Sequence, residues 1–325
     1  MISVESIFET ILVMQNPQGA NFSLIKLGFP EKDIYYGKDM DGNFIFSAAS
    51  QNTQLRPSLQ KTKKLIFWFN ASCRFTVNNA YTEKIMNVLT CTSSDKDELI
   101  AFIRLTLAFI HDTEDTSPKR MYELFTLLTN LFASANKASL VELQGFYGEL
   151  YAIKYFNQMG VNLSDFWQKR EKMKFDFSVS SQKKIEVKST TKDTRVHHFK
   201  HEQLLSDLYD ICVISIMLRA DDKGNSLFDL VQDVRVIASN NFETLIYIED
   251  FIKSFDHVEL DNIRFDSTYT DRHLHVYKAE NVPRFEENQP RGVSKTEYDS
   301  DLSNSSILKN NLFIDWVRNE ENRSF

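Results

Sequence analysis

Hydrophobic and polar positions change their spacing near residue 95 of the chain. Before that point, short apolar runs rich in aromatic and β-branched residues alternate with turn residues, as strands and hairpins do. The strand-like runs are NFSLIKLGF (21–29), NFIFSAAS (43–50), KLIFWFNA (64–71) and CRFTVN (73–78), and the turns are KDMDGN (38–43) and NNAYT (78–82). We therefore expect an antiparallel β module over about residues 21–90, preceded by an amphipathic helix in MISVESIFETILVMQ.

Beyond residue 95 the apolar residues recur at helical spacing. The stretches with this period are DELIAFIRLTLAFIHD (97–112) and PKRMYELFTLLTNLFASA (118–135). Pro118 suits the first turn of the second helix, where its missing N–H costs nothing. These helices are expected to connect the β module to the rest of the chain.

The order of elements over residues 138–218 is helix, strand, strand, helix and strand. The helix SLVELQGFYGELYAIKYFNQMG ends at Gly160, a typical C-cap residue. The strands KFDFSV (174–179) and KKIEVKS (183–189) follow, then a predicted helix FKHEQLLSDLY (199–209). The run DICVISIML (210–218) is continuously apolar, as a strand buried on both faces is. This order predicts a mixed sheet with flanking helices.

The last part of the chain is expected to extend the same domain. It contains a helical stretch from residue 241, a strand in HLHVYKAENVPRF and a terminal helix in SSILKNNLFIDWVRNEE. The predicted organisation is a β-rich module at 1–95, a helical connector at 96–137, a core at 138–240 and a C-terminal extension at 241–325. The predicted fold class is α/β, or α+β overall, and the strands of 21–90 should form a sheet separate from that of the core.

Composition limits the class of protein. The chain has 325 residues, of which 42% are hydrophobic, so it can bury a core and is not disordered. Its three cysteines are widely spaced and form no CxxC pair, so the sequence predicts neither a structural zinc site nor a disulfide framework. No run approaches the roughly 18 apolar residues of a membrane helix. We expect a cytoplasmic protein that does not contact a membrane.

Candidate chemistry first arises from the two strands around residue 180. If Ser180–Gln182 form the loop, Val179 pairs with Lys183 and Asp176 falls opposite Glu186 on the same face. Two carboxylates that close repel unless a cation lies between them. Magnesium binds through one or two carboxylates and keeps several waters. The alternative is a half-exposed hairpin whose charges face solvent.

Two further residues extend this constellation. Lys188 lies on the same face as Glu186, about 7 Å along the strand. Glu149 lies at the flank of the inward stripe of the preceding helix, and no cation lies three or four residues from it to explain it as a surface ion pair. Gly145 and Gly148 are unfavourable in a helix interior, which indicates close approach by backbone or ligand. The alternative is a Glu at the edge of the core with its head group in water.

These residues resemble the core of the PD-(D/E)XK nucleases. The matching motifs are the helix GELYA with Glu149, the strand FDFS with Asp176, and the strand IEVKST with Glu186 and Lys188. More narrowly, the chain is similar to an uncharacterised bacterial family of PD-(D/E)XK members found beside restriction and phage-defence genes. RVHHFKHEQLL (195–205) and VPRFEENQPRGV (282–293) add to the resemblance, which covers most of the chain and is sharp over 143–205. Phe175 stands where the superfamily name has Pro.

The resemblance implies a restriction-endonuclease-like fold and a role for each matching residue. Glu149, Asp176 and Glu186 would hold Mg²⁺, for which Mn²⁺ would substitute, and Lys188 would orient the attacking water. All four residues are present, which argues against an inactive relative. DNA would be the substrate and other defence-system proteins the partners, and the resemblance leaves a homodimer open.

Polar residues after the second strand are further candidates. Arg195, His197 and His198 are interpreted as phosphate-binding residues or supports of the carboxylates, together with the nearby His201. A zinc site at these histidines lacks a fourth ligand close in sequence. Gln203 is a candidate active-site residue by resemblance, and an ordinary helix-surface Gln is the alternative. For His273 and His275 a plain surface strand is the better interpretation.

The local charge favours a polyanionic substrate. Residues 165–201 contain ten Lys or Arg and five Asp or Glu, a local charge of +5, whereas the whole chain has −7. Such a basic strip on an acidic protein attracts a phosphate backbone to one place. The leading hypothesis is therefore a magnesium-dependent DNA endonuclease. The alternatives are a catalytically inactive module that binds nucleic acid or a partner protein, and a nuclease that trims RNA or structured DNA. Carboxylates paired to Lys188, with no cavity shared among them, would favour the inactive module.

Overall fold

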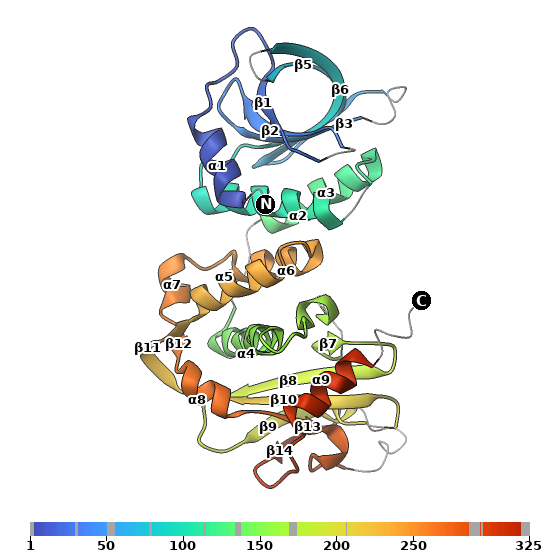
Figure 1. Ribbon diagram of the computed structural model, residues 1–325, viewed down its shortest axis with the longest axis vertical. Coiled ribbons are helices and arrows are strands. Elements are labelled where there is room, and N and C mark those ends of the chain that lie inside the picture. The colour runs from blue at the N-terminus through green and yellow to red at the C-terminus, as the bar shows by residue number, and fades with distance from the viewer. Residues whose placement is uncertain are drawn as a thin grey trace. The chain divides into compact units, whose positions relative to one another are not determined.

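The chain divides into two units, and each combines separate segments of sequence. The computed structural model describes residues 3–29, 32–50, 56–77, 80–112, 115–133, 138–168, 174–205, 207–285, 293 and 295–319. Unit 1 consists of Met1–Ala135 and Asn240–Lys253, and unit 2 of Asn136–Ser239 and Ser254–Phe325 (Figure 1). The predicted domain boundaries divide the chain differently, and they stay a prediction.

Unit 1 is built on a sheet that closes on itself. Its strands are β1 (Phe22–Lys26), β2 (Ile34–Asp39), β3 (Phe44–Ala49), β4 (Ser58–Lys61), β5 (Leu65–Val77) and β6 (Ala80–Cys91). They follow the order β1-β2-β3-β6-β5-β4, and a parallel pairing of β1 with β5 closes the ring seen in Figure 1. The predicted turn KDMDGN is confirmed, with Gly42 at φ 84°. None of these strands joins the sheet that carries Glu186, as predicted.

The long strand β5 pairs with β4 and then with β1, because it bends at Asn70. This residue has φ 50°, and the pairing with β6 shifts register between Trp68 and Ala71. The part before the bend pairs with β4, and the part after it pairs with β1. The two predicted strands at 64–71 and 73–78 are thus one bent strand.

Helices cover the outside of this ring. They are α1 (Val4–Val13), α2 (Lys96–Asp112), α3 (Pro118–Leu131) and α6 (Phe242–Ile252). One buried core lies between helices and sheet, and it includes Phe67, Phe102 and Leu245. A second core, with Phe75 and Val88, lies on the opposite face of the strands. The predicted helices are confirmed, and α6 joins unit 1 although it follows most of unit 2 in sequence.

Unit 2 contains a mixed sheet, which confirms the predicted α+β class. Its order is β13-β10-β8-β7, with β8 and β10 parallel and the other pairs antiparallel. The strands are β7 (Phe177–Ser178), β8 (Lys183–Thr190), β10 (Asp210–Met217) and β13 (Leu274–Lys278). Seven consecutive residues of β10, from Ile211 to Met217, are buried, as the apolar run predicted.

Helices and two-stranded ribbons surround this sheet. The helices are α4 (Leu140–Asn157), α5 (Leu227–Ile237), α7 (His257–Asp261), α8 (Ser267–Arg272) and α9 (Asn310–Arg318), with 3-10 turns at η1 (Leu163–Phe166), η2 (His201–Gln203) and η3 (Ala279–Asn281). The ribbons pair β9 (Val196–Lys200) with β14 (Glu297–Asp301), and β11 (Ala220–Ser226) with β12 (Arg264–Phe265). No helix among the described residues has the length and apolar character needed to span a bilayer.

The predicted helix over 199–209 is wrong. Residues up to Lys200 belong to β9, and only His201–Gln203 form a helical turn. Side-chain burial in β9 alternates from residue to residue, which is the period of a strand. The pairing partner β14 lies about a hundred residues further along, so local sequence gives no sign of it. Residues 286–292 of the VPRFEENQPRGV segment lie outside the described residues.

One close approach sets the position of α4 on the sheet. A Cβ on Gly148 would stand 3.0 Å from Ser189 Cβ and 3.7 Å from Val187 Cγ1, both on β8. Gly148 thus lets the helix approach the strand closely, as predicted. A Cβ on Gly145 would meet nothing within 4 Å, so close approach does not explain that glycine. The next residue after Gly148 is Glu149, which is therefore held beside β8.

Candidate active site

The register predicted for the two strands is confirmed. Phe177 pairs with Ile185 and Ser178 with Lys184, which extrapolates to Asp176 opposite Glu186. The strand β7 begins at Phe177 and does not include Asp176, because Asp176 turns its carboxylate to the backbone of β8. Its Oδ2 accepts a hydrogen bond of 2.6 Å from the Val187 N–H. A carboxylate thus takes the place of a strand partner at this point of β8.

Glu186 is the most deeply buried acidic group of the constellation. It is 2% exposed, so the interpretation as a solvent-facing hairpin is wrong for this residue. Its Oε1 accepts from Lys188 Nζ at 2.7 Å and from Gln203 Nε2 at 2.6 Å, while its buried Oε2 has no hydrogen-bond partner among the described residues. Burial, and then the charge of Asp176, raises the pKa of Glu186 to about 8, against the opposing effect of Lys188.

Glu149 is held by a residue that the sequence did not indicate. Trp167, which is buried just after η1, donates from Nε1 to Glu149 Oε2 at 2.6 Å. Burial and the charges of Asp176 and Glu186 raise the pKa of Glu149 well above its usual range, whereas the Trp167 hydrogen bond lowers it. Glu149 is thus an acidic group of the same electrostatic cluster, not a solvated residue at the edge of a helix.

Lys188 is the cation of this cluster. Burial alone would lower its pKa, but the charges of Glu186, Asp176 and Glu149 outweigh that effect and raise it. The pKa of Asp176 is raised by burial, while the Val187 N–H and the charge of Lys188 work against that rise. Three carboxyl groups and one ammonium therefore form one site in which their pKa values depend on one another's charges.

Gln203 completes the cluster and is not an ordinary surface residue. Its Nε2 donates to Glu186 Oε1, and its Oε1 accepts from Lys188 Nζ at 3.3 Å and from the Lys200 N–H at 2.9 Å. The 3-10 turn η2 thereby fixes the amide between the two charged groups. The structure thus brings Glu149, Asp176, Glu186, Lys188 and Gln203 into one cluster.

The donor set of this cluster suits a hard divalent cation. Among the described residues, no three His, Cys, Asp or Glu side chains converge closely enough to form a ready-made metal site. The chemistry nevertheless fits, because carboxylate oxygens are the ligands that magnesium prefers. Glu186 Oε2 is buried without a partner, and such a group in a native protein requires an explanation. Glu149, Asp176 and Glu186 are the residues that could hold the ion.

Arg195 and His197 form a hydrogen-bonded cluster around Ser215, the residue of β10 that pairs with Lys188 of β8. Arg195 donates to Ser215 O at 2.9 Å, to Ser215 Oγ at 2.8 Å and to His273 O at 2.8 Å. His197 Nε2 bonds Ser215 Oγ at 2.6 Å. Burial, and then the charge of Arg195, lowers the pKa of His197 to about 3. Both side chains are thus buried, and their role in binding phosphate or supporting the carboxylates stays a prediction.

The other predicted histidines have separate surroundings. His198 is exposed on the β9–β14 ribbon, where Asp299 and Glu297 bind its ring nitrogens and raise its pKa. His201 is buried, and its Nε2 has no hydrogen-bond partner among the described residues. The surface strand predicted for His273 and His275 is wrong, because β13 pairs with β10 and buries most of its residues. His273 lies just before that strand and stacks on Tyr269.

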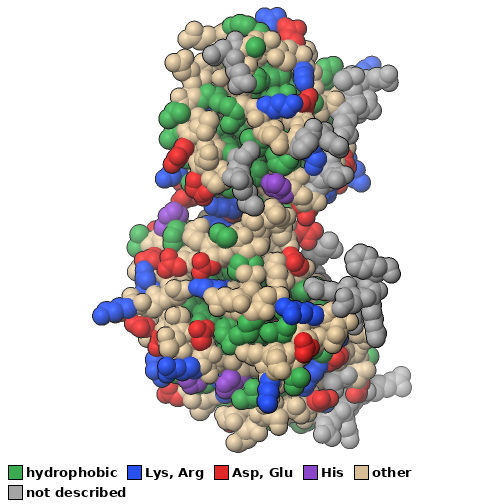
Figure 2. All heavy atoms as spheres, viewed as in Figure 1, with side chains coloured by type: hydrophobic (Ala, Val, Ile, Leu, Met, Phe, Trp, Pro, Cys, Tyr) green, Lys and Arg blue, Asp and Glu red, His purple; other side chains and the backbone are tan. Residues whose placement is uncertain are grey.

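Several of the cationic side chains counted in the sequence make internal contacts. Lys174 pairs with Glu202 at 2.8 Å, Lys183 donates to Trp316 O at 2.7 Å, and Lys184 donates to Ser180 O at 2.7 Å. On the face drawn in Figure 2, Lys and Arg are interspersed with Asp and Glu and form no single basic area. The pairing of Lys174 with Glu202 offsets one positive charge, whereas a hydrogen bond to a carbonyl oxygen leaves Lys183 and Lys184 charged.

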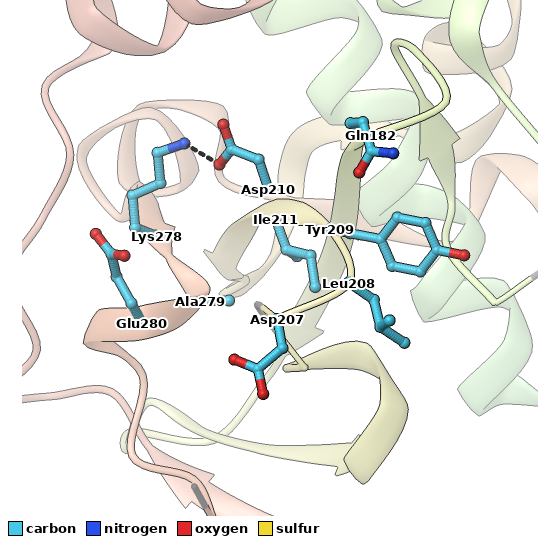
Figure 3. A pocket seen from close by; sticks show the side chains of 9 residues that line it. All are labelled: Gln182, Asp207, Leu208, Tyr209, Asp210, Ile211, Lys278, Ala279 and Glu280. Carbon is cyan, nitrogen blue, oxygen red and sulfur yellow. Dashed lines mark hydrogen bonds and ion pairs between the residues drawn. The ribbon is translucent and has the colours of Figure 1, made fainter. Parts of the chain in front are cut away.

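A pocket of about 290 Å³ lies elsewhere in unit 2, at the beginning of β10. Its lining residues are Gln182, Asp207, Leu208, Tyr209, Asp210, Ile211, Lys278, Ala279 and Glu280, and Figure 3 shows Lys278 reaching Asp210. Trp316 Nε1 donates to the same Asp210, at 2.6 Å from Oδ2. Asp210 is thus paired with a cation and a hydrogen-bond donor, whereas Glu186 Oε2 has no hydrogen-bond partner among the described residues.

Comparison with known proteins gives one match. A family model described as "Putative PD-(D/E)XK family member, (DUF4420)" matches residues 6–303. No curated protein and no solved structure matches the chain. The match spans both units, and it includes every residue of the cluster around Glu186.

Proposed function

Because the chain belongs to the "Putative PD-(D/E)XK family member" family, we propose that it is a magnesium-dependent DNA endonuclease. The observation that carries this proposal is the buried Oε2 of Glu186, which has no hydrogen-bond partner among the described residues. A purely structural role would leave a buried carboxylate oxygen without a hydrogen-bond partner, which costs stability without return. If a cation binds at this site, that oxygen becomes one of its ligands.

The chemistry follows from the cluster. A divalent ion held by Glu149, Asp176 and Glu186 would stabilise the negative charge that develops on phosphorus-bound oxygens and would lower the pKa of a water molecule. Lys188 contributes a partly buried positive charge with three donors, of which Glu186 and Gln203 use two. The remaining donor can hold the attacking water or a phosphate oxygen. Gln203 keeps the ammonium in place through its Oε1.

A second candidate is a catalytically inactive module that binds nucleic acid or a partner protein. The observation that favours it is the ion pair of Lys188 with Glu186, which neutralises one proposed ligand. Against it stands the number of acidic groups around Lys188: burial, and then the charge of Asp176, raises the pKa of Glu186 although the ion pair with Lys188 works against that rise. One lysine therefore does not balance the three acidic groups.

A cleavage assay distinguishes the two candidates. Supercoiled DNA, linear duplex, single-stranded DNA and RNA are incubated with the full chain in magnesium, manganese or EDTA. We expect cleavage of DNA with either metal, none in EDTA, and none with Glu186→Gln. A wild-type chain that binds these substrates and leaves all of them intact in both metals would establish the inactive module.

The biological role that we propose is restriction or phage defence, and a partner protein or a second copy of the chain can take part. Cells expressing the wild type should be infected less efficiently than cells expressing Lys188→Ala, because only the former can degrade incoming DNA. Equal plating of several unrelated phages on both strains would contradict this role and leave the cleavage chemistry untouched.

A further inference from the structure

The longest stretch of the chain without Asp or Glu is residues 42–82, in unit 1. It carries five cations, Arg56, Lys61, Lys63, Lys64 and Arg74, on a protein of net charge −7. Lys64 pairs with Glu98, and Arg74 pairs with Glu83. The other three, on and beside β4, are exposed and form no ion pair with a described residue. This edge of the sheet therefore presents uncompensated positive charge.

An exposed aromatic side chain lies beside these cations. Along β5, Phe67 faces the helices and stacks on Phe125, with ring centroids 5.6 Å apart. The next residue, Trp68, points to the opposite face of the strand and is 38% exposed. Its partner on β4 is Leu59, which is 56% exposed, and Lys61 lies two residues further on the same face. Indole, leucine and ammonium thus form one surface.

Protection against aggregation does not explain this surface. Among the described strands, β4 pairs with β5 alone, and exposed edge strands often carry lysine to prevent pairing with another chain. That role accounts for Lys61 and Lys63, but an exposed Trp68 works against it. An aromatic platform flanked by cations is instead how proteins bind unpaired nucleotides, whose bases stack while their phosphates meet Lys and Arg.

We propose that the β4–β5 surface, made of Arg56, Leu59, Lys61, Lys63 and Trp68, binds single-stranded nucleic acid. A base stacks on the exposed indole of Trp68, and the three cations contact the neighbouring phosphates. The inference rests on the proposed function for the class of substrate, and it adds the form of strand that unit 1 binds. Charge complementarity supports a polyanion, and the stacking platform favours unpaired bases over a duplex.

The test measures binding without cleavage. The full chain is titrated in EDTA against fluorescently labelled oligothymidylate and against a duplex, and anisotropy is recorded over a range of salt concentrations. Trp68→Leu removes the platform, Trp68→Tyr retains an aromatic ring, and a double variant changes Lys61 and Lys63 to Glu. Lys223→Glu is the matched control, because Lys223 is likewise exposed and lies on β11 of unit 2. Thermal melts verify that each variant folds.

Trp68→Leu should weaken binding of oligothymidylate by about tenfold, since stacking on an aromatic side chain contributes roughly 1–3 kcal/mol per base. Trp68→Tyr should bind nearly as the wild type does. The Lys61 and Lys63 variant should lower the slope of log affinity against log salt by about 0.7 for each phosphate that the protein no longer neutralises. Lys223→Glu should change neither quantity.

Unchanged affinity and salt slope in the folded Trp68→Leu and double variants would overturn the inference. So would an effect confined to the duplex, because the proposal specifies unpaired strands. The outcome separates this surface from the proposed nuclease. If binding depends on Trp68 but the wild type cleaves nothing in magnesium, the binding surface is supported and the nuclease proposal is contradicted. If the wild type cleaves but these variants bind normally, the nuclease is supported and the binding surface is contradicted.

Discussion

Trp167 Nε1 lies 2.6 Å from Glu149 Oε2 and donates a hydrogen bond to it. The indole ring is buried between Phe146 and Phe177, with ring centroids 6.0 and 6.2 Å away. Packing therefore fixes the position of Trp167 Nε1. This donor in turn fixes Oε2 of Glu149, a proposed metal ligand. Trp167 is a positioning residue, because its contact is with the ligand and not with the reacting atoms.

Trp167→Phe should retain the stacked ring and lose only this donor. The Trp167 hydrogen bond lowers the pKa of Glu149, so its removal should raise that pKa further and disfavour the charged form that binds metal. Removal of such a supporting residue typically weakens metal binding or activity by about 10–100-fold. The measurement is cleavage rate against magnesium concentration, in which the half-saturating concentration should rise more than the maximal rate falls.

Trp316→Phe is the control for that experiment. Trp316 Nε1 also donates to a carboxylate, Asp210 Oδ2, over the same 2.6 Å, but beside the pocket of Figure 3. This variant should leave the magnesium dependence unchanged. Equal shifts in both variants would mean that loss of stability, and not the position of Glu149, causes the effect.

The two glycines of α4 offer a paired test of the helix position. Gly148→Ala places a Cβ 3.0 Å from Ser189 Cβ, so the helix or Ser189 must shift by a few tenths of an ångström. A displacement of about 1 Å at an active site can cost on the order of 100-fold in rate, and we expect at least a tenfold loss of cleavage. Gly145→Ala meets open space, and it should raise stability by up to about 1 kcal/mol with unchanged activity.

Lys188→Ala should separate catalysis from metal binding. A protonated lysine offers no lone pair to a metal, so calorimetry with manganese should show affinity equal to or higher than that of the wild type. Cleavage should fall by about 100-fold or more, as is typical when one donor that stabilises developing charge is removed from an active site. Lys184→Ala, two residues before Glu186 on β8 and bound to Ser178 and Ser180, should cleave normally. Loss of metal binding as severe as that of Glu186→Ala would contradict the assigned role.

Local sequence was sufficient where the determining contacts are local. The β7–β8 register follows from side-chain alternation and a three-residue loop, and the structure has it as predicted. The close approach at Gly148 likewise follows from one helix and its unfavourable residue. The hairpin contacts join residues near one another along the chain, so periodicity and turn length determine them. For Gly148 the sequence indicated a close approach but not its partner, Ser189, which lies about forty residues further along.

Contacts between distant residues could not be found in this way. Trp167 touches Glu149 across a segment of irregular backbone, and no motif marks it. The strand β9 pairs with β14 beyond η3, which is why Val196–Lys200 were not predicted as a strand. The closure of unit 1 depends on a parallel pairing between Phe22 and Phe75. Such pairings are determined by packing of the whole unit, which a single sequence does not display.

His197 should make stability depend on pH. Its pKa is lowered to about 3 in the folded protein, mainly by burial, whereas an unfolded chain protonates histidine near pH 6.5. Below pH 6.5 the unfolded state therefore binds a proton that the folded state refuses, so stability should fall as pH decreases. Urea unfolding between pH 7.5 and 4.5 should show this loss, and His197→Gln should reduce it.

The neighbouring histidine provides a control of opposite sign. His198 has a raised pKa because Asp299 and Glu297 bind its ring, so its contribution is present at low pH and is lost as pH rises through the folded pKa. Its side chain is 59% exposed, so solvent screens the effect and keeps it small. If His198→Gln abolished the acid sensitivity instead of His197→Gln, the assignment to the buried histidine would be wrong.

Glu149→Gln tests whether three carboxyl groups are held together for chemistry. Glutamine can still accept the Trp167 hydrogen bond, but it cannot be charged. Burial and the neighbouring acids raise the pKa of Glu149 in the folded state, so the wild type loses stability as pH rises above the ordinary carboxyl value. The variant should therefore melt at a higher temperature in EDTA, by a margin that grows from pH 5 to pH 8.

The same variant should lose function, because a neutral amide is a poor ligand for magnesium. Higher stability without metal combined with lost activity is typical of sites where unfavourable charges are retained for a reaction. We expect at least a tenfold loss of cleavage in magnesium, measured as a time course beside the melts. Glu142→Gln on the same helix, where the carboxylate accepts from Ser139 in a capping box, should instead lower the melting temperature and leave the cleavage rate unchanged. Unchanged cleavage in Glu149→Gln would remove Glu149 from the site and leave Asp176, Glu186 and Lys188 as its charged members.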